Sequence, residues 1–330
     1  MVSNSGRWRG YSLKGAVGLL VGTLVLAAAS VVPAQSRGVP AQSRVKVLLV
    51  TGQSNRYHNW EVSSPIVKRQ LEESGRFAVT VATTPPKGAE PNQDMSSFAP
   101  KFSDYQAVVL DYEGFEFAPP VKQAFVDYVK NGGGLVVLHA ADNAFPGWPE
   151  YNEMIGVGGW GGFTPGYASR TEAAGPKIRW RDGGLVLDKD TPGTAQHPSP
   201  HDFLMTVRSP EHPIMKGLPV AWVHAGDELY SNLRGPARNV TILATATAPT
   251  SMTNGTGENE PMVMAITYGK GRVFHDTLGH VGATQKEPIV PMASVDYIVL
   301  LQRGTEWAAT GAVTIPVPRD FPTADKTSVR

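Results

Sequence analysis

The sequence predicts an α/β fold, with a doubly wound, mostly parallel sheet flanked by helices and interrupted by an irregular insertion. Apolar runs at residues 45–50, 105–111 and 135–138 have the continuous hydrophobic character of strands buried on both faces of a sheet. Stretches with helical spacing lie between strands, and the connections are short. This alternation favours parallel strands joined by helical crossovers.

Boundary residues place the elements of the first half. Ser63 or Ser64 is expected to cap the first helix, with Pro65 in its first turn and Gly75 after its end. The second helix carries one apolar face and stops before a run of glycines. The predicted order is a strand at residues 45–50, a helix at 63–75, strands at 77–81 and 105–111, a helix at 119–130 and a strand at 135–138.

The second half begins with the irregular insertion, at residues 146–200, where the hydrophobic pattern weakens. One or two antiparallel strands are expected within it, at residues 177–187. A short turn at residues 269–271 between two apolar runs indicates a hairpin. The remaining elements are strands at 203–207, 240–245, 261–268 and 271–278, and a closing helix at 291–308.

The N-terminus has the pattern of a secretory signal peptide. Basic residues precede an apolar stretch at residues 15–32, and a small-residue processing site follows at 32–34. A retained anchor is the alternative, because the stretch approaches the ~20 residues that span a bilayer. We therefore predict a signal peptide at 1–34, a disordered leader at 35–44, one domain at 45–310 and a loose tail at 311–330.

Export to the periplasm or the exterior follows from that leader, and no other segment is apolar for long enough to cross a membrane. The chain has 330 residues, 41% of them hydrophobic, which is enough for a full core. A net charge of +1 without a long basic run argues against nucleic acid as a partner. The absence of cysteine excludes disulfides, thiolate metal sites and a cysteine nucleophile. The oligomeric state is not indicated.

The central strand ends at His139, within the stretch GGGLVVLHAADNAF. Open α/β sheets place ligands at the carboxyl ends of their strands. In related architectures a serine or cysteine nucleophile occupies such a strand-to-helix turn. Because this position holds a histidine and GxSxG is absent, the sequence argues against acyl-enzyme chemistry.

Two further histidines, His58 and His280, also follow predicted strands. The carboxyl ends of parallel strands converge, so His58, His139 and His280 can meet despite their separation in sequence. Imidazoles transfer protons near neutral pH and bind Zn²⁺ or similar metals. No HExxH spacing is present, and hydrogen-bonded core histidines are the structural alternative.

Acidic and aromatic residues complete the predicted site. Asp227 and Glu228 are adjacent, so one can accept backbone hydrogen bonds while the other faces a ligand. A helix or turn cap is the alternative for this pair. Trp60 and Trp160 lie in predicted loops, where an aromatic ring can stack on a sugar or simply pack. His212 precedes a proline and can also serve only to shape a turn.

Five segments together resemble the ThuA-like (trehalose utilisation) family: YHNW, GGGLVVLHAA, EHPIMKGLP, GDELY and YGKGRVFHDTLGH. The resemblance covers residues 45–308. It implies a flavodoxin-like fold similar to class I glutamine amidotransferases, whose elbow residue is a cysteine. Because His139 occupies that position and the chain has no cysteine, glutamine hydrolysis is excluded.

The resemblance implies carbohydrate metabolism, with a small sugar related to trehalose or a keto-glycoside as the ligand. Asn59 departs from the acidic residue expected after the first histidine. We expect a hydrolase, lyase or isomerase; a non-catalytic sugar-binding module and an accessory subunit of a sugar oxidoreductase are the alternatives. The predicted residues are His139, His280, Asp227 and Glu228 for catalysis, His58, Trp60, His212 and Trp160 for substrate, and His58, His139 and His280 for a divalent metal such as zinc.

Overall fold

The computed structural model describes residues 44–86, 88, 93–160, 175–191 and 193–330, together with residues 10 and 12. The predicted signal peptide and leader therefore lie almost entirely outside the described residues, as does part of the irregular insertion. Residues 43–330 form one compact unit. No helix in the described part of the chain is both long enough and apolar enough to cross a membrane.

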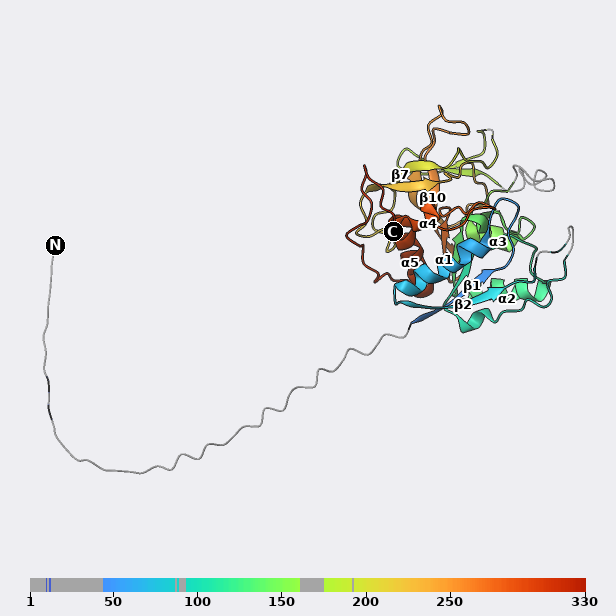
Figure 1. Cartoon of the computed structure of the whole chain (residues 1–330), viewed down its shortest axis with the longest axis horizontal. Helices are drawn as coiled ribbons and strands as arrows, with labels where there is room; N and C mark the ends of the chain where they lie inside the picture. The colour runs from blue at the N-terminus through green and yellow to red at the C-terminus, as the bar shows by residue number, and fades with distance from the viewer. Residues whose placement is uncertain are drawn as a thin grey trace, which may run out of the picture. The chain divides into compact units, whose positions relative to one another are not determined.

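Most strands join a single sheet of nine (Figure 1). Its members are β1 (Val45–Thr51), β2 (Phe77–Thr83), β3 (Ala107–Leu110), β4 (Gly134–Leu138), β7 (His201–Val207), β8 (Ala221–Asp227), β9 (Val240–Ala246), β10 (Glu260–Tyr268) and β11 (Gly271–Asp276). A separate antiparallel hairpin contains β5 (Lys177–Arg181) and β6 (Gly184–Asp188). The predicted hairpin, β10–β11, is confirmed, as are the antiparallel strands expected at residues 177–187.

The strand order is β2-β1-β3-β4-β11-β10-β9-β7-β8. The pairs from β2 to β11 are parallel. The pairs from β11 to β8 are antiparallel. The expectation of a mostly parallel sheet is therefore wrong, and the sheet is mixed. The second half departs from the predicted pattern because its strands are joined by turns and loops, without the helical crossovers that parallel pairing requires.

Helices cover both faces of the sheet, as predicted. They are α1 (Trp60–Glu73), α2 (Pro119–Lys130), α3 (Pro149–Ile155), α4 (Val290–Ala293) and α5 (Val295–Thr310). Along β1, Val47 and Leu49 pack in one core with residues of α1 and α5, while Leu48 and Val50 pack in another with α2 and α3. Successive side chains of a strand point to opposite faces, so the two cores lie on opposite sides of the sheet.

Helix α1 begins at Trp60, about one turn before the predicted start. Ser63 and Ser64 do not cap it. Their hydroxyl groups both donate to Asp111 Oδ2 at 2.6 Å, which ties the first turns of the helix to the end of β3. These two serines were predicted as caps because residues of this type usually mark helix starts. The carboxylate that binds them is distant in sequence and gave no local signal.

The C-terminal stretch was predicted to be a loose tail, and this expectation is corrected. The carbonyl of Thr323 accepts the backbone N–H of Val223 in the outermost strand, β8, at 2.8 Å. Phe321 is buried and its ring packs edge-on against Trp222. The carbonyl of Ile315 accepts a hydrogen bond from the Arg303 guanidinium in α5. Segment 311–330 therefore covers an edge of the sheet and belongs to the domain.

Candidate functional site

The carboxyl ends of β1, β3, β4 and β11 lie at one edge of the sheet because these strands are parallel. Strand β8 points the same way, since four successive antiparallel pairings separate it from β11. The residues that follow these strands are His58 after β1, Glu113 after β3, His139 after β4, His280 after β11 and Glu228 after β8. The predicted convergence of distant imidazoles is confirmed at this edge: ligand atoms of His58, His139 and His280 lie within 4.8 Å of one another.

His139 has one ring nitrogen fixed and the other directed into the cluster. Its φ of 32° is unusual for a residue with a side chain, as expected at a sharp turn after a strand. The Nδ1–H donates to the carbonyl of Thr277 at 2.7 Å, because a carbonyl can only accept. In neutral His139 the lone pair is therefore on Nε2. Burial, followed by the charges of His280 and His58, lowers the pKa of His139 well below its ordinary value, which keeps this lone pair available.

His58 is oriented by a carboxylate. Its Nδ1 lies 2.9 Å from Glu113 Oε2, and Asn55 Nδ2 donates to the other oxygen of Glu113 at 2.8 Å. Burial acts to lower the pKa of His58, but the hydrogen bond and charge of Glu113 outweigh it and raise the pKa. With Nδ1–H donated to Glu113, Nε2 of His58 faces the cluster.

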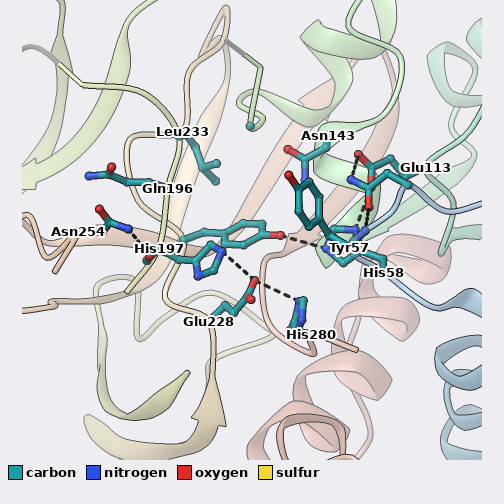
Figure 2. A pocket seen from close by; sticks show the side chains of 14 residues that line it. Tyr57, His58, Glu113, Asn143, Gln196, His197, Glu228, Leu233, Asn254 and His280 are labelled. Carbon is teal, nitrogen blue, oxygen red and sulfur yellow. Dashed lines mark hydrogen bonds and ion pairs between the residues drawn. The ribbon is translucent and has the colours of Figure 1, made fainter. Parts of the chain in front are cut away.

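His280 and Glu228 close the opposite side. His280 Nδ1 lies 3.0 Å from His139 Nε2 and 3.1 Å from Glu228 Oε2. The same carboxylate oxygen lies 3.8 Å from His139 Nε2 and 3.4 Å from Nε2 of His197. Figure 2 shows Glu228 between His280 and His197, with both contacts drawn. Glu228 is therefore positioned to accept a proton, or to bind a cation, beside the imidazoles.

Asp227 has a different role from the predicted catalytic one. It is fully buried, and its two oxygens accept the backbone N–H groups of Glu228, Gly279 and His280. Its Oδ2 also lies 3.0 Å from His224 Nε2. A carboxylate surrounded by four such groups cannot reach a ligand, so Asp227 is a positioning residue for the backbone of Glu228 and His280.

His224 is a buried imidazole held between two carboxylates. Its Nδ1 lies 2.8 Å from Asp296 Oδ2, which also accepts a hydrogen bond from Trp222 Nε1. Burial acts to lower its pKa, but Asp296 and Asp227 raise it to about 10. The protonated ring is therefore part of the support behind the cluster and not a reacting group.

The cluster offers three nitrogen ligands to a divalent metal, with ligand atoms within 4.8 Å of one another. Zinc bonds histidine nitrogen at about 2.0–2.1 Å, so neighbouring ligands in a tetrahedral site lie about 3.3 Å apart. The separations of 3.0 Å from His139 Nε2 to His280 Nδ1 and 3.1 Å from His280 Nδ1 to Glu228 Oε2 are close to that value. Metal-binding histidines usually donate their second ring N–H to a carboxylate or a carbonyl, as His58 and His139 do here.

A cavity of about 430 Å³ opens onto this cluster. This volume lies within the ~300–1,000 Å³ typical of small-molecule sites. Figure 2 shows His58 and Glu113 at one end, and Gln196 and Asn254 beyond His197 at the other. The lining residues in the described part of the chain are Asn55, Tyr57, His58, Glu113, Asn143, Gly159, Ala195, Gln196, His197, Glu228, Tyr230, Leu233, Asn254 and His280. Amide, imidazole and carboxylate groups dominate its polar lining, and no lysine or arginine is among these residues.

Three predicted substrate residues lie elsewhere. Trp160 is 1% exposed and its Nε1 donates to the carbonyl of Ala144, so its assignment as a sugar contact is corrected to a core role. His212 packs against Trp307 of α5 in the connection after β7, at the opposite edge of the sheet, and burial lowers its pKa to about 4. Trp60 begins α1 and does not line the cavity.

Sequence reasoning missed the roles of Tyr230 and His197 in the cavity. The Tyr230 hydroxyl lies 3.0 Å from His139 Nε2, and His197 contacts Glu228. Tyr230 falls within the GDELY segment, two residues after Glu228, so that segment was a usable signal. His197 sits in a loop with no strand directly before it and gave none.

Comparisons with known proteins place the chain in a family. A family model described as trehalose utilisation, ThuA, matches residues 46–308. This chain belongs to the ThuA family. No protein with a curated description matches it. The ThuA assignment agrees with the resemblance expected from the five sequence segments.

Solved structures of ThuA-like proteins are similar to this chain. One from Parabacteroides merdae is 46% identical, with a TM-score of 0.79 over 87% of this chain and 98% of that chain. Another, from Bacteroides uniformis, is 17% identical, with a TM-score of 0.48 over 86% of this chain and 98% of that chain. The first supports the mixed α/β fold described above for this ThuA chain.

Proposed function

We propose that this ThuA-family protein is an enzyme of carbohydrate metabolism that acts on a disaccharide or keto-glycoside. The observation that carries the proposal is the cluster of His58, His139 and His280 beside a small-molecule cavity that His58 and His280 line. Three imidazoles from separate strands, two of them fixed by hydrogen bonds through Nδ1, are a costly arrangement to maintain without a ligand.

The cluster is proposed to hold a divalent metal such as zinc. His139 supplies Nε2, and Glu113 and the carbonyl of Thr277 orient His58 and His139 respectively. A metal at this position would polarise a carbonyl or hydroxyl oxygen of the substrate. Glu228, at the edge of the cluster, would then accept or return a proton. Hydrolysis, elimination and isomerisation of a keto sugar all need this combination of a polarised oxygen and a nearby base.

The cavity supports a sugar as the substrate. Gln196 and Asn254 line it away from the histidines, and Leu233 contributes an apolar surface. Amide groups can donate to and accept from hydroxyl groups, which suits a polyhydroxylated ring. The family description, trehalose utilisation, agrees with this class of substrate. A flavodoxin-like arrangement of the parallel half of the sheet would place the ligand at the strand ends where the cavity lies.

Turnover of keto-disaccharides by the purified protein tests the proposal. We expect activity in the wild-type protein, and its loss in His139→Ala and His280→Ala with the far-ultraviolet circular dichroism spectrum unchanged. His212→Ala, at the opposite edge of the sheet, is the matched control and should retain activity. Full activity in both cluster variants would overturn the assignment. Calorimetric binding of a disaccharide without any product would instead indicate a sugar-binding module.

Export is proposed on the sequence pattern of residues 1–34 alone, which suits an enzyme acting on imported or extracellular glycans. Cell fractionation with N-terminal sequencing tests it. We expect the mature chain in the periplasm or medium, starting near residue 35. A cytoplasmic chain that retains its first residues would contradict export.

A further inference from the structure

The hydroxyl of Tyr230 lies beside the lone pairs that a metal would use. It is 3.0 Å from His139 Nε2 and 3.4 Å from His58 Nε2. His139 donates its Nδ1–H to Thr277, so its Nε2 can only accept, and the phenol donates to it. Tyr230 is 8% exposed, and in the described residues its hydroxyl lies within hydrogen-bonding distance of these two histidines.

The ring of Tyr230 is held firmly in this position. It packs against the His139 ring at a centroid distance of 4.5 Å and against His197 at 5.8 Å. The next residue, Ser231, exchanges backbone hydrogen bonds with Gln196 at 2.8 and 3.2 Å. A donor fixed in this way needs little reorganisation to stabilise charge that develops beside it.

Metal binding would remove both acceptors from this hydroxyl. A cation held by the three histidines uses the lone pairs on Nε2 of His139 and His58. A buried donor left without an acceptor costs free energy, so the hydroxyl must find another partner. A substrate oxygen or an anion bound beside the metal would offer one.

We propose that Tyr230 is a catalytic residue whose hydroxyl moves its hydrogen bond from His139 to the substrate oxygen once a metal occupies the histidine cluster. This inference rests on the proposed function, because it needs the metal. The hydroxyl acts as a hydrogen-bond donor to the substrate oxygen, as in an oxyanion hole. The lone pair on His139 Nε2, which the Tyr230 hydroxyl and His280 Nδ1 both approach at 3.0 Å, would pass to the metal on loading.

Azide binding to the Co²⁺-loaded protein, followed by visible absorption, tests the inference without a turnover assay. Azide occupies an open metal position and accepts a hydrogen bond. Tyr230→Phe removes the donor and keeps the ring, so azide should bind about tenfold more weakly or worse. Tyr151→Phe is the matched control: its buried hydroxyl donates to the carbonyl of Ala141 and does not line the cavity. The control should bind azide as the wild type does.

The possible outcomes distinguish the proposed role of Tyr230 from the proposed metal site on which it depends. Equal azide affinities in wild type and Tyr230→Phe, both loaded with Co²⁺, would overturn the role of Tyr230 alone. Tighter azide binding in Tyr230→Phe would show that the phenol oxygen competes for the metal, which also overturns it. A wild-type protein that binds no Co²⁺ would overturn the metal proposal and this inference together.

Discussion

Asp227 holds the backbone of His280, because its Oδ1 accepts the His280 N–H at 3.1 Å. The same oxygen accepts the N–H of Glu228 at 2.8 Å, and Oδ2 accepts that of Gly279 at 2.7 Å. One buried carboxylate therefore joins the segment after β8 to the segment after β11. The position of the His280 imidazole relative to Glu228 therefore depends on Asp227, which no ligand can reach.

Asp227→Asn should destabilise the protein and loosen the cluster. An amide is a weaker acceptor for four donors, and it leaves the charged His224 with one carboxylate partner instead of two. Removing one partner of a buried ion pair costs about 3–5 kcal/mol. Urea denaturation should show a decrease of this order in the free energy of unfolding. Glu211→Gln, an exposed substitution after β7, is the control and should change stability by less than about 0.5 kcal/mol. A stable Asp227→Asn protein would contradict the positioning role.

The charged state of His224 should make stability fall at high pH. Its pKa is raised from 6.5 to about 10 by its two carboxylates, although burial opposes the shift. A group whose pKa is higher in the folded protein stabilises it fully below the unfolded pKa and loses this contribution as pH rises through the folded pKa. The difference in free energy of unfolding between wild type and His224→Gln should therefore be largest at pH 6 and decrease towards pH 10. A difference that stays constant between these limits would show that the ring is neutral throughout.

The C-terminal segment should contribute measurably to stability. Phe321 is 8% exposed and packs against Trp222, so Phe321→Ala leaves a cavity over β8. Buried phenylalanine-to-alanine changes cost about 3–5 kcal/mol, and the lower end applies to a residue near the surface. Val329→Ala, at a side chain 49% exposed, should be close to neutral in the same denaturation experiment. Equal free energies of unfolding for the two variants would indicate that the C-terminal segment is loose, as the sequence predicts.

The sequence predicted which strands end at the site, but not the direction in which most of the other strands of the sheet pair. Continuous apolar runs located β1, β4 and β11, and the rule that parallel strands share a carboxyl edge brought His58, His139 and His280 together correctly. Apart from the β10–β11 hairpin, the antiparallel half of the sheet was not predicted, because pairing direction depends on connections whose course has no local signature.

Side-chain roles were harder to predict than side-chain positions. The sequence predicted that one of Asp227 and Glu228 accepts backbone hydrogen bonds, but not that this residue is Asp227, because two of its donors belong to the segment after β11, far along the chain. Trp160 was expected to meet a sugar because its glycine-rich neighbours indicate a loop, but its ring fills the core. The segment after residue 311 has alternating apolar residues, Val313, Ile315 and Val317, that pack on the core, but nothing local to them indicates the strand edge that the segment covers. In each case the contacts that determine the role come from elsewhere in the sequence, so the local residue pattern does not indicate them.

Zn²⁺ titration calorimetry of the chelator-treated protein tests whether His58, His139 and His280 bind one divalent metal ion. We predict one tight site per chain in the wild type, and loss of that site in His139→Ala, with the His212→Ala control unchanged. Zn²⁺ binding that is absent from the wild type, or that survives unchanged in His139→Ala, would contradict the account.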